Sequence, residues 1–368
     1  MKLRIKKVII YIIQKIVAFR LVNITDAFVS RHSRVERFLI ESDIFPDVWG
    51  EGAHLEKNDS LAEYYSGFRS KCNIIYFEMQ GDGYSFNSNH LCDKYGRYYY
   101  ESNVNYIPAL SRLNIKRRKH LNGTCAYLSN TEPQHYGHFI MFVLPLIEKY
   151  KKFSKEKPDF YYVGDIKLKE FHFTLLELAG VSKEQVINYP CTADRILYVS
   201  IDRTFYVKNK KYWDYPSYCY IRELVKGFIK NKSTGRKIYV SRGAVKWRKI
   251  INEKDLIDKL IYKGFEVVSM DGLSLKDQAK IFSEADIIVA AHGAALTNLI
   301  YCNLGATIIE IFPFNYPDVT SYVFSAYSGC EYYRVEGDIY DTDTNACYRN
   351  IYAKVDNIVN LLDGIEVK

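Results

Sequence analysis

The stretch of the chain whose residue types best suit chemistry is 285–313, where a histidine and very small residues follow a buried-strand pattern. An uncharged apolar run, 287–291, ends at His292 and Gly293, and two alanines follow. So little side-chain bulk lets phosphate oxygens reach backbone N–H groups at the start of a helix, where the helix dipole favours negative charge. The pattern indicates a site for the diphosphate of a nucleotide. A tightly packed turn without a ligand is the alternative, which the small residues alone do not exclude.

Two arginines could supply the positive charge for such a site. Arg242 follows a predicted strand, 237–240, at its carboxyl end, where ligands of open α/β sheets bind, and Arg248 comes shortly after it. Guanidinium groups bind phosphate oxygens in a bidentate manner, so the pair could replace a metal ion as the clamp on a developing negative charge. The alternative for each arginine is an ordinary solvated surface charge. Thr297 and Asn298 could donate to phosphate or cap turns within the following helix.

Glu310 lies inside an apolar strand pattern, 307–312, where a lone carboxylate is costly to bury unless it is paired. At the carboxyl end of a strand it could accept hydrogen bonds from ribose hydroxyls, as acidic residues do in other dinucleotide-binding folds. We therefore predict a ribose contact for Glu310, with a buried ion pair to an arginine as the alternative.

His138 is the predicted general base. Imidazole titrates near neutral pH and can take the proton of a hydroxyl group, and the preceding Tyr136 and Gly137 permit a close approach. The alternative is a packed and hydrogen-bonded histidine, which is the more common fate of a lone histidine in an apolar helix. His135 and His292 are further candidates, and His292 is better suited to donating a hydrogen bond to phosphate.

Metal or redox chemistry has little support in the sequence. The eight cysteines form no CxxC pair and have no metal-ligand spacing, so we interpret them as free thiols of a reducing compartment. Asp341 and Asp343 have the DxD form of a metal-binding motif, but they lie in a polar segment outside any predicted nucleotide-binding unit, which favours a surface loop. We expect neither a metal nor a bound cofactor.

The elements that must position these residues alternate between strand and helix. The strands predicted in the first half are 74–77, 98–100, 124–129, 159–163 and 196–199, and the helices are 137–151, kinked at Pro145, and 168–178. The strands predicted in the second half are 237–240, 265–268, 287–291 and 307–312, and the helices are 215–231, 252–262, 275–283, 294–303 and 348–362. This alternation is typical of doubly wound parallel sheets, and predicts an α/β protein with two Rossmann-like domains.

At 368 residues the chain is long enough for two domains with separate cores. The segment 231–235 is the best linker candidate, because it is short, polar and ends in glycine. The predicted segments are a basic amphipathic helix at 1–28, an acceptor-side domain at 29–230, a nucleotide-binding domain at 236–345, and a helical segment at 346–368 that packs back toward the first domain.

The positive charge is concentrated at the N-terminus. The formal net charge is +8, and residues 1–40 carry nine Lys or Arg against Asp26 and Glu36, so the remainder is close to neutral. That distribution argues against a nucleic-acid partner. Residues 1–22 could lie in the headgroup layer of an anionic membrane or pack on their own domain, but their uncharged run is too short to span a bilayer. We expect a cytoplasmic protein, peripheral on the inner face of the cytoplasmic membrane if the helix binds lipid.

Residues 236–315 resemble glycosyltransferase family 61, whose bacterial members are often described as capsular polysaccharide biosynthesis proteins. A second, shorter match lies in the first half. The residues that carry the resemblance are Tyr239-Val-Ser-Arg242, Arg248, Asn252-Glu253, Leu275, Gln278, Ala285-Asp286, His292-Gly-Ala-Ala-Leu-Thr-Asn298, Gly305-Ala306 and Glu310, together with Tyr136-Gly-His138 and Val143-Leu-Pro145. Their order and spacing are far more specific than a single glycine turn.

The resemblance implies a GT-B-like enzyme, with two Rossmann-like domains facing a cleft. It would move a hexose or pentose from a nucleotide-sugar to a hydroxyl of a glycan or lipid-linked glycan, with inversion and without an obligatory metal, in cell-surface polysaccharide synthesis. The donor-binding residues predicted on this basis are Ser241, Arg242, Arg248, His292, Gly293, Ala294, Ala295, Thr297, Asn298 and Glu310. His138 is the predicted catalytic residue, and His135 and Tyr136 are predicted on the acceptor side.

The first-half match departs from the family pattern. An acidic residue commonly stands four positions after the histidine, where this chain has Phe142, and Leu146 replaces an arginine. If that acid orients the histidine or acts as the base in relatives, this chain must use another group. Two other functions remain open: a pyruvyl or phosphoryl transferase acting on polysaccharide, and a non-catalytic nucleotide-sugar-binding component of a polysaccharide assembly complex.

Overall fold

The computed structural model describes residues 21–23, 35–44, 53–55, 71–81, 84–87, 90–93, 98–100, 118–129, 132–203, 215–230, 234–243, 245–340 and 345–366. The chain forms two compact units, Met1–Ile44 with Ser70–Phe205 and Phe45–Arg69 with Tyr206–Lys368. The boundary therefore falls earlier than the predicted linker, and a segment of the first hundred residues belongs to the second unit. Most of the predicted helix 1–28 lies outside the described residues, and Leu21–Asn23 within it is a strand, β1. No described helix has the length and apolar content needed to cross a bilayer.

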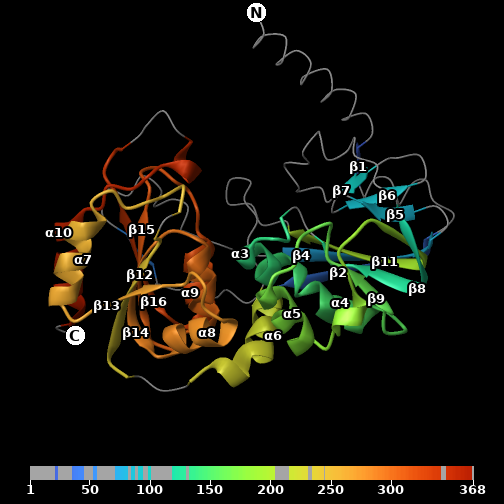
Figure 1. Ribbon diagram of the computed structural model, residues 1–368, viewed down its shortest axis with the longest axis horizontal. Coiled ribbons are helices and arrows are strands. Elements are labelled where there is room, and N and C mark those ends of the chain that lie inside the picture. The colour runs from blue at the N-terminus through green and yellow to red at the C-terminus, as the bar shows by residue number, and fades with distance from the viewer. Residues whose placement is uncertain are drawn as a thin grey trace, which may run out of the picture. The chain divides into compact units, whose positions relative to one another are not determined.

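The second unit is built on a parallel sheet (Figure 1). Its strands, in spatial order, are β13 (Glu266–Ser269), β12 (Arg236–Ser241), β14 (Ala285–Ala291), β15 (Thr307–Phe312), β16 (Glu331–Glu336) and β3 (Ala53–Leu55), and every pairing between neighbours is parallel. The doubly wound parallel sheet predicted for the second half is confirmed. The strand β16 was not predicted, because its sequence mixes charged and apolar residues and has no clear strand pattern.

The strand order of this sheet fixes where a ligand site is expected. From β12 the chain moves outward to β13, then returns past β12 to β14 and continues in the opposite direction to β15 and β16. The loops after β12 and β14 therefore leave on opposite sides of the sheet. Open α/β sheets bind ligands in the crevice beyond the carboxyl ends of the strands at such a reversal. Arg242 and His292 are the first residues after these two strands.

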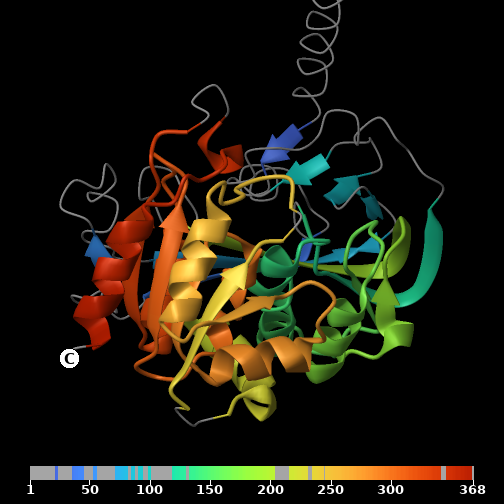
Figure 2. The same ribbon diagram turned by 60° about the vertical axis from the view of Figure 1, so that its left-hand side comes forward.

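Helices cover both faces of the sheet, as Figures 1 and 2 show. The helices α7 (Glu253–Tyr262) and α10 (Val355–Glu366) lie on one face, and α8 (Leu275–Ser283) and α9 (Thr320–Ser328) lie on the other. Alternate strand residues such as Val289, Ile309 and Val335 share a core with Leu256 of α7 and Leu362 of α10. The C-terminal segment was predicted to pack back toward the first domain, and its apolar stripe is part of this core of the second unit.

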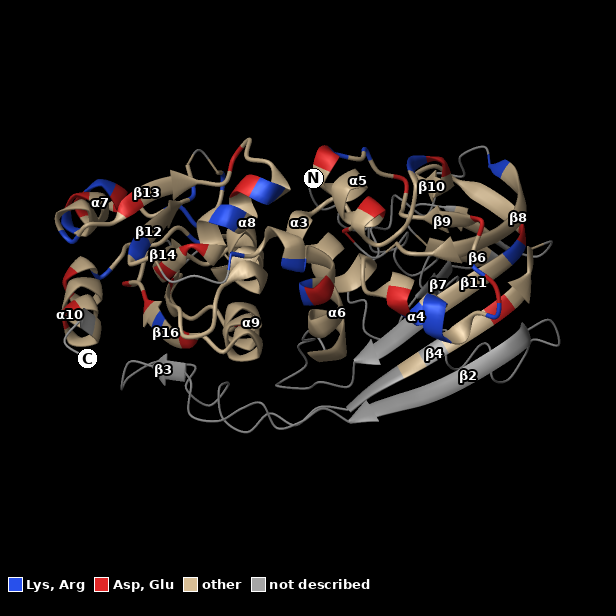
Figure 3. Cartoon of the chain, turned by 90° about the horizontal axis from the view of Figure 1, so that it is seen from below, with Lys and Arg blue, Asp and Glu red and all other residues tan. Residues whose placement is uncertain are grey.

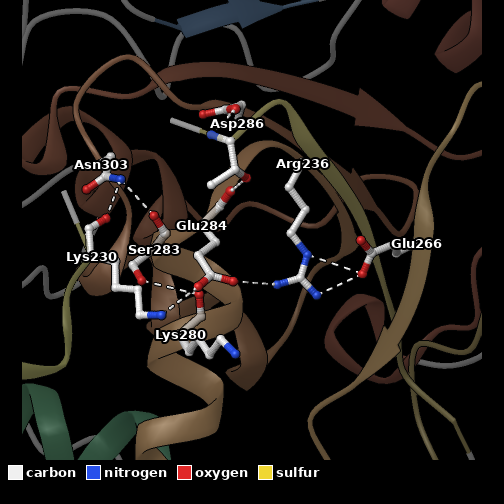
Figure 4. Close-up of polar contacts among 9 residues, drawn as sticks. Lys230, Arg236, Glu266, Lys280, Ser283, Glu284, Asp286 and Asn303 are labelled. Carbon is white, nitrogen blue, oxygen red and sulfur yellow. Dashed lines mark hydrogen bonds and ion pairs between the residues drawn. The ribbon is translucent and has the colours of Figure 1, made fainter. Parts of the chain in front are cut away.

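Charged side chains fasten the opposite, amino-terminal edge of the sheet (Figure 4). Arg236, at the start of β12, pairs with Glu266 at 2.8 Å and Glu284 at 3.2 Å, and these carboxylates stand at the start of β13 and just before β14. The side chain of Asp286 accepts from the amide nitrogen of Thr234 at 3.1 Å. Exposed ion pairs contribute little each, but this network joins three strand starts and so helps to fix the relative positions of the strand ends.

The helix α6 (Tyr215–Val225) belongs to the second unit, although its residues were predicted in the first domain. The hydroxyl of Tyr218 lies 2.8 Å from that of Ser328 in α9. Arg222 donates from its guanidinium to the carbonyl oxygen of Ile300. The predicted helix at 215–231 is confirmed in its first three turns.

The first unit has a mixed sheet, with β11 (Cys191–Arg203) near its centre. This strand pairs in parallel with β8 (Lys119–Tyr127) and antiparallel with β4 (Lys71–Gln80). The other strands are β2 (Val35–Ile44), β5 (Tyr84–Asn87), β6 (His90–Asp93), β7 (Tyr98–Tyr100), β9 (Phe160–Tyr162) and β10 (Val186–Ile187). The α/β class is confirmed here, but the Rossmann-like parallel sheet predicted for this half is wrong. The helix α5 (Glu170–Leu178) forms close to its predicted position.

The predicted helix at 137–151 is present but is interrupted. It begins with a short turn, α3 (Tyr136–His138), passes through a wide turn, η3 (Phe139–Val143), and continues as α4 (Leu146–Phe153). The amide nitrogen of Leu144 donates to the carbonyl oxygen of Phe139, five residues back, at 2.9 Å. Such π-type turns often mark functional positions, and Pro145, which has no N–H to donate, follows directly. His138 stands at the junction between the first two turns.

Candidate functional site

The carboxyl ends of β12 and β14 bring Arg242 and His292 together. The Arg242 guanidinium donates from Nη1 to the carbonyl oxygen of His292 at 2.7 Å. These residues are separated by 50 positions in the sequence and meet only because their strands are neighbours. The association between the first arginine and the small-residue turn, which the sequence predicted, is therefore a direct contact.

Arg242, His292 and Gly293, with the start of the helix that follows, form a corner at the carboxyl edge of the sheet. Gly293 leaves space there for the Arg242 guanidinium. Its backbone is extended, so no unusual torsion favours glycine. A Cβ atom built there would lie only 1.7 Å from Nη1 of Arg242, so a side chain at this position would require the guanidinium to move away. The next residue, Ala294, is exposed and begins the 3₁₀ helix η6 (Ala294–Tyr301), whose first N–H groups lack partners within the helix. The corner thus combines open backbone donors with a guanidinium group.

Replacing Gly293 with alanine is expected to push the Arg242 side chain out of this position. The added methyl group removes the space that Nη1 occupies, so the hydrogen bond to His292 breaks and the guanidinium no longer faces the corner. We expect affinity for a nucleoside diphosphate to fall roughly tenfold, the loss typical of one charged hydrogen bond. Calorimetric titration of both proteins measures this. Unchanged affinity in a folded variant would contradict the role given to Gly293.

Arg242 and Arg248 form a positive pair that lacks a carboxylate partner among the described residues. The Nε atoms of both side chains are buried without a hydrogen-bond partner. Burial, together with the charge of Arg248, lowers the pKa of Arg242 to about 10. Arg248 also adopts a left-handed backbone conformation, with a φ of 57° that is uncommon for a residue with a long side chain. The folded unit therefore holds two like charges together, an arrangement that an anion would relieve.

His292 is held by a buried carboxylate. Its Nδ1 atom lies 2.6 Å from Oε1 of Glu310, and its ring stacks on Phe312 at 4.6 Å and meets the edge of Tyr316 at 5.1 Å. Because Nδ1 is committed to Glu310, Nε2 is the ring nitrogen left to contact a ligand. With both ring nitrogens protonated, a histidine so fixed can donate a hydrogen bond from Nε2 to an anion.

The ribose contact predicted for Glu310 does not fit the structure. The residue has no exposed surface. Its Oε1 also accepts from the Ser321 hydroxyl at 2.9 Å, and its Oε2 accepts from the Tyr332 hydroxyl at 2.5 Å. The alternative, burial as part of a pair, is nearer the observation, although the partner is His292 and not an arginine. Glu310 thus acts on the corner through the histidine.

Two other predicted donor-binding residues, Asn298 and Ser241, have structural tasks, and Thr297 is buried. Asn298 is completely buried and donates from its side chain to Gln278 at 2.9 Å, so it cannot reach a ligand at the corner. Thr297 is 5% exposed. The hydroxyl of Ser241 donates to Oε1 of Glu253 at 2.8 Å and accepts from the Gly243 amide nitrogen at 3.2 Å, which shapes the turn before Arg248.

His138, in the first unit, has an acidic neighbour that sequence reasoning missed. Its Nδ1 atom lies 3.4 Å from Oε2 of Glu132, and both side chains are partly exposed. Phe142, which takes the position of the family's usual acid, meets the imidazole at 5.6 Å in an edge-on geometry. Burial lowers the pKa of His138 below its usual value, the charge of Glu132 opposes that shift, and His135 adds to it. An imidazole with a lowered pKa and a carboxylate partner is suited to act as a general base.

The other two first-unit residues lie on the same turn. His135 is exposed, and its ring lies 5.9 Å from that of His138. Tyr136 packs its ring edge-on against Phe171 of α5 at 5.3 Å. The structure places both residues on the turn that carries His138. It does not assign them a ligand.

Among the residues that the structure describes, no cluster of three or more His, Cys, Asp or Glu side chains could hold a metal ion. Asp341 and Asp343 lie outside the described residues. The described cysteines, including Cys125 and Cys302, are free thiols, as the sequence predicted.

Comparison with known families agrees with this geometry. Residues 136–309 match the family model described as Glycosyltransferase 61, a range that runs from Tyr136 through His138 and Arg242 to the corner at His292. No curated protein matches the chain. The family model thus spans the first-unit histidine and the second-unit arginine corner together, which supports assignment of the chain to glycosyltransferase family 61.

Proposed function

We propose that this glycosyltransferase moves a hexose or pentose from a nucleotide-sugar to a hydroxyl group of a glycan or lipid-linked glycan, with inversion and without an obligatory metal. We further propose a GT-B-like arrangement, in which the second unit binds the donor and the first unit contributes to the acceptor side. The family assignment supports glycosyl transfer, and the corner in the second unit supports a diphosphate-linked donor.

The donor assignment rests on Arg242 and Arg248, two neighbouring positive charges that have no carboxylate partner among the described residues. Two buried guanidinium nitrogens have no hydrogen-bond partner among the described residues, and they lie beside a helix start and a fixed histidine. Such nitrogens are costly for a folded protein unless a ligand uses them. A diphosphate offers several acceptor oxygens and negative charge, which match these donors. The site also stands at the reversal point of the sheet, where such ligands bind.

In this proposal the second unit stabilises the leaving group. The acceptor oxygen attacks the anomeric carbon as the bond from that carbon to the diphosphate breaks, and the electron pair of that bond stays on the diphosphate. Arg242, Arg248 and Nε2 of His292 donate to the phosphate oxygens as this charge develops. Donors that are already in place cost no reorganisation at that moment, which makes them effective in the transition state.

In the first unit, His138 takes the proton of the acceptor hydroxyl. Glu132 holds Nδ1 of the imidazole, so Nε2 is the atom that accepts the proton. The carboxylate also stabilises the imidazolium that forms. Glu132 would thus perform the task that an acidic side chain at the position of Phe142 could perform in relatives.

The cellular setting is part of the same proposal. We place the enzyme in cell-surface polysaccharide synthesis, such as that of a capsule, in the cytoplasm or on the inner face of the cytoplasmic membrane. The concentration of basic residues in the first 40 positions supports contact with anionic lipid through residues 1–22. Removing residues 1–22 and measuring pelleting with anionic vesicles tests this, and unchanged pelleting would contradict it.

A ligand panel tests the donor class. Thermal unfolding with uridine, guanosine, cytidine and adenosine diphosphates and with phosphoenolpyruvate, all in EDTA, is expected to show stabilisation by at least one nucleoside diphosphate. The corresponding nucleotide-sugar should then be hydrolysed or transferred without added metal. Stabilisation by phosphoenolpyruvate alone would favour a pyruvyl transferase. Binding of a nucleotide-sugar without turnover would favour a binding protein, and activity that needs manganese would contradict the metal-independent mechanism.

A further inference from the structure

An exposed aromatic pair stands beside the diphosphate corner and has no task in the mechanism above. Trp247 is 39% exposed and Tyr348 is 48% exposed, and their ring centroids are 5.1 Å apart. The rings are tilted by 45° and not stacked, so each keeps open surface. The ammonium group of Lys246 lies 4.4 Å from the centre of the indole. Large aromatic side chains exposed together are unusual for a surface with no ligand.

The backbone holds these two rings in place, although they come from distant parts of the sequence. The amide of Ile351 donates to the carbonyl of Lys249 at 2.8 Å, and the amide of Ile251 donates to the carbonyl of Ile351 at 2.8 Å. The side chain of Asn350 accepts from the Lys249 amide at 3.0 Å. The segment after β12 and the segment before α10 are therefore joined like two short strands, which fixes Trp247 against Tyr348.

The same segments connect directly to the corner. Trp247 precedes Arg248, and Arg349, which follows Tyr348, donates to the carbonyl oxygen of Phe314 at 3.2 Å. That loop carries Tyr316, whose ring meets His292. Burial and the charge of Asp318 raise the pKa of Tyr316, while the charge of Arg248 opposes the increase, so the arginine lies within electrostatic reach of that hydroxyl. The segments that carry the aromatic pair therefore also carry Arg248 and contact the loop that packs on His292.

We propose that Trp247 and Tyr348 form the face on which the nucleobase of the donor lies. This inference rests on the proposed function, because it needs the diphosphate to sit at the corner. A nucleoside diphosphate has a flat aromatic ring at one end and negative charge at the other, and this surface offers aromatic rings at one end and guanidinium groups at the other. Every base has a π-face that stacks on aromatic side chains, so such a contact adds affinity without a hydrogen-bonding code.

Calorimetric titrations in EDTA with four nucleoside diphosphates (uridine, guanosine, cytidine and adenosine) and with inorganic pyrophosphate test the inference. Wild-type protein is expected to bind at least one nucleoside diphosphate more tightly than pyrophosphate. Trp247→Ala should weaken that nucleotide about tenfold, a typical loss for one aromatic stacking partner, and leave pyrophosphate affinity unchanged. Trp247→Phe should retain most of the affinity. Tyr262→Ala removes an aromatic residue that is 93% exposed at the far end of α7, and should change neither ligand.

The possible outcomes separate the two proposals. If Trp247→Ala binds the nucleotide as tightly as wild type, or loses pyrophosphate to the same degree, the nucleobase assignment is overturned while the diphosphate site stands. A loss confined to the KM for the acceptor would also overturn it and would assign the aromatic pair to the acceptor. If wild-type protein binds neither nucleotide nor pyrophosphate, the proposed donor site itself is wrong and the inference fails with it.

Discussion

Replacing Arg242 with methionine is expected to lower kcat/KM for the donor by about 100- to 1,000-fold, the loss typical when one preorganised donor to a developing charge is removed. Methionine keeps most of the side-chain length but has no charge. The guanidinium donates to the carbonyl oxygen of His292, has a buried Nε without a partner, and lies beside Arg248. Its interaction with the diphosphate should strengthen as the diphosphate gains charge, so kcat should fall while the KM for the donor rises.

Arg236→Met is the matched control for this experiment. Arg236 begins the same strand that ends before Arg242, and its guanidinium pairs with Glu266 and Glu284 at the opposite edge of the sheet (Figure 4). Its loss should lower the melting temperature slightly and leave kcat/KM close to wild type. Equal losses of activity in both variants would mean that Arg242 has only a structural role. Steady-state kinetics at several donor concentrations, with a melting curve for each protein, provide the comparison.

Replacing His138 with alanine is expected to lower turnover at least a hundredfold, the size of effect that removal of a general base typically gives. The imidazole stands on the interrupted helix of the first unit, and Glu132 is the carboxylate that orients it. His120→Ala is the control, because His120 is an exposed histidine of the same unit that pairs with Asp194 on the surface. A His138→Ala variant that keeps near-normal turnover would remove this residue from the mechanism.

The pH dependence of the reaction distinguishes a base from a structural histidine. Burial lowers the pKa of His138, and only the neutral imidazole can accept a proton, so activity should be lost as the pH falls through that pKa. The charge of Glu132 raises the same pKa, so Glu132→Gln should move the acidic limb of the kcat/KM profile to lower pH. An acidic limb that does not move in this variant would contradict the assignment of Glu132.

The sequence predicted the second unit well because its elements are long, regular and local. The apolar run before His292 and the β-branched run at Thr307–Phe312 form the expected buried strands. Ser274 caps α8, accepting from the Asp277 amide at 3.2 Å. Each of these signals lies within a few residues of the element that it specifies.

Features that depend on distant partners were not predicted. The environment of Glu310 is set by Ser321 and Tyr332, residues of α9 and β16 that carry no pattern linking them to a carboxylate on β15. The strand β11 pairs in parallel with one neighbour and antiparallel with another. That direction depends on how the strands of the sheet assemble, because short apolar runs have the same pattern in parallel and antiparallel strands. The packing of α10 beside α7 likewise depends on which apolar face of the sheet the other helices leave exposed.

The acidic partner of His138 was missed for a related reason. Sequence reasoning looked one helical turn after the histidine, where an acid would lie on the same face, and found Phe142. Glu132 precedes the histidine by six positions, and the turn at 133–135 brings it back to the imidazole. A local signal did exist, because Pro133 so close to a helix start indicates a chain reversal.

Charge on the described surface does not point to a second anion site of this kind. Figure 3 shows Lys and Arg interspersed with Asp and Glu over both units, for example along α7. Mixed charge of this sort is typical of solvated helix faces. Arg242 and Arg248 stand out because their like charges interact with each other and both have a buried Nε without a hydrogen-bond partner among the described residues.

A crystal structure of the protein with a nucleoside diphosphate, grown in EDTA, would show directly whether the diphosphate binds at Arg242 and His292 without a metal. We expect the phosphate oxygens to lie within hydrogen-bond distance of the Arg242 guanidinium and of the backbone N–H groups that follow Gly293, with no metal between them. A diphosphate bound elsewhere, or bound here only through a divalent cation, would contradict it.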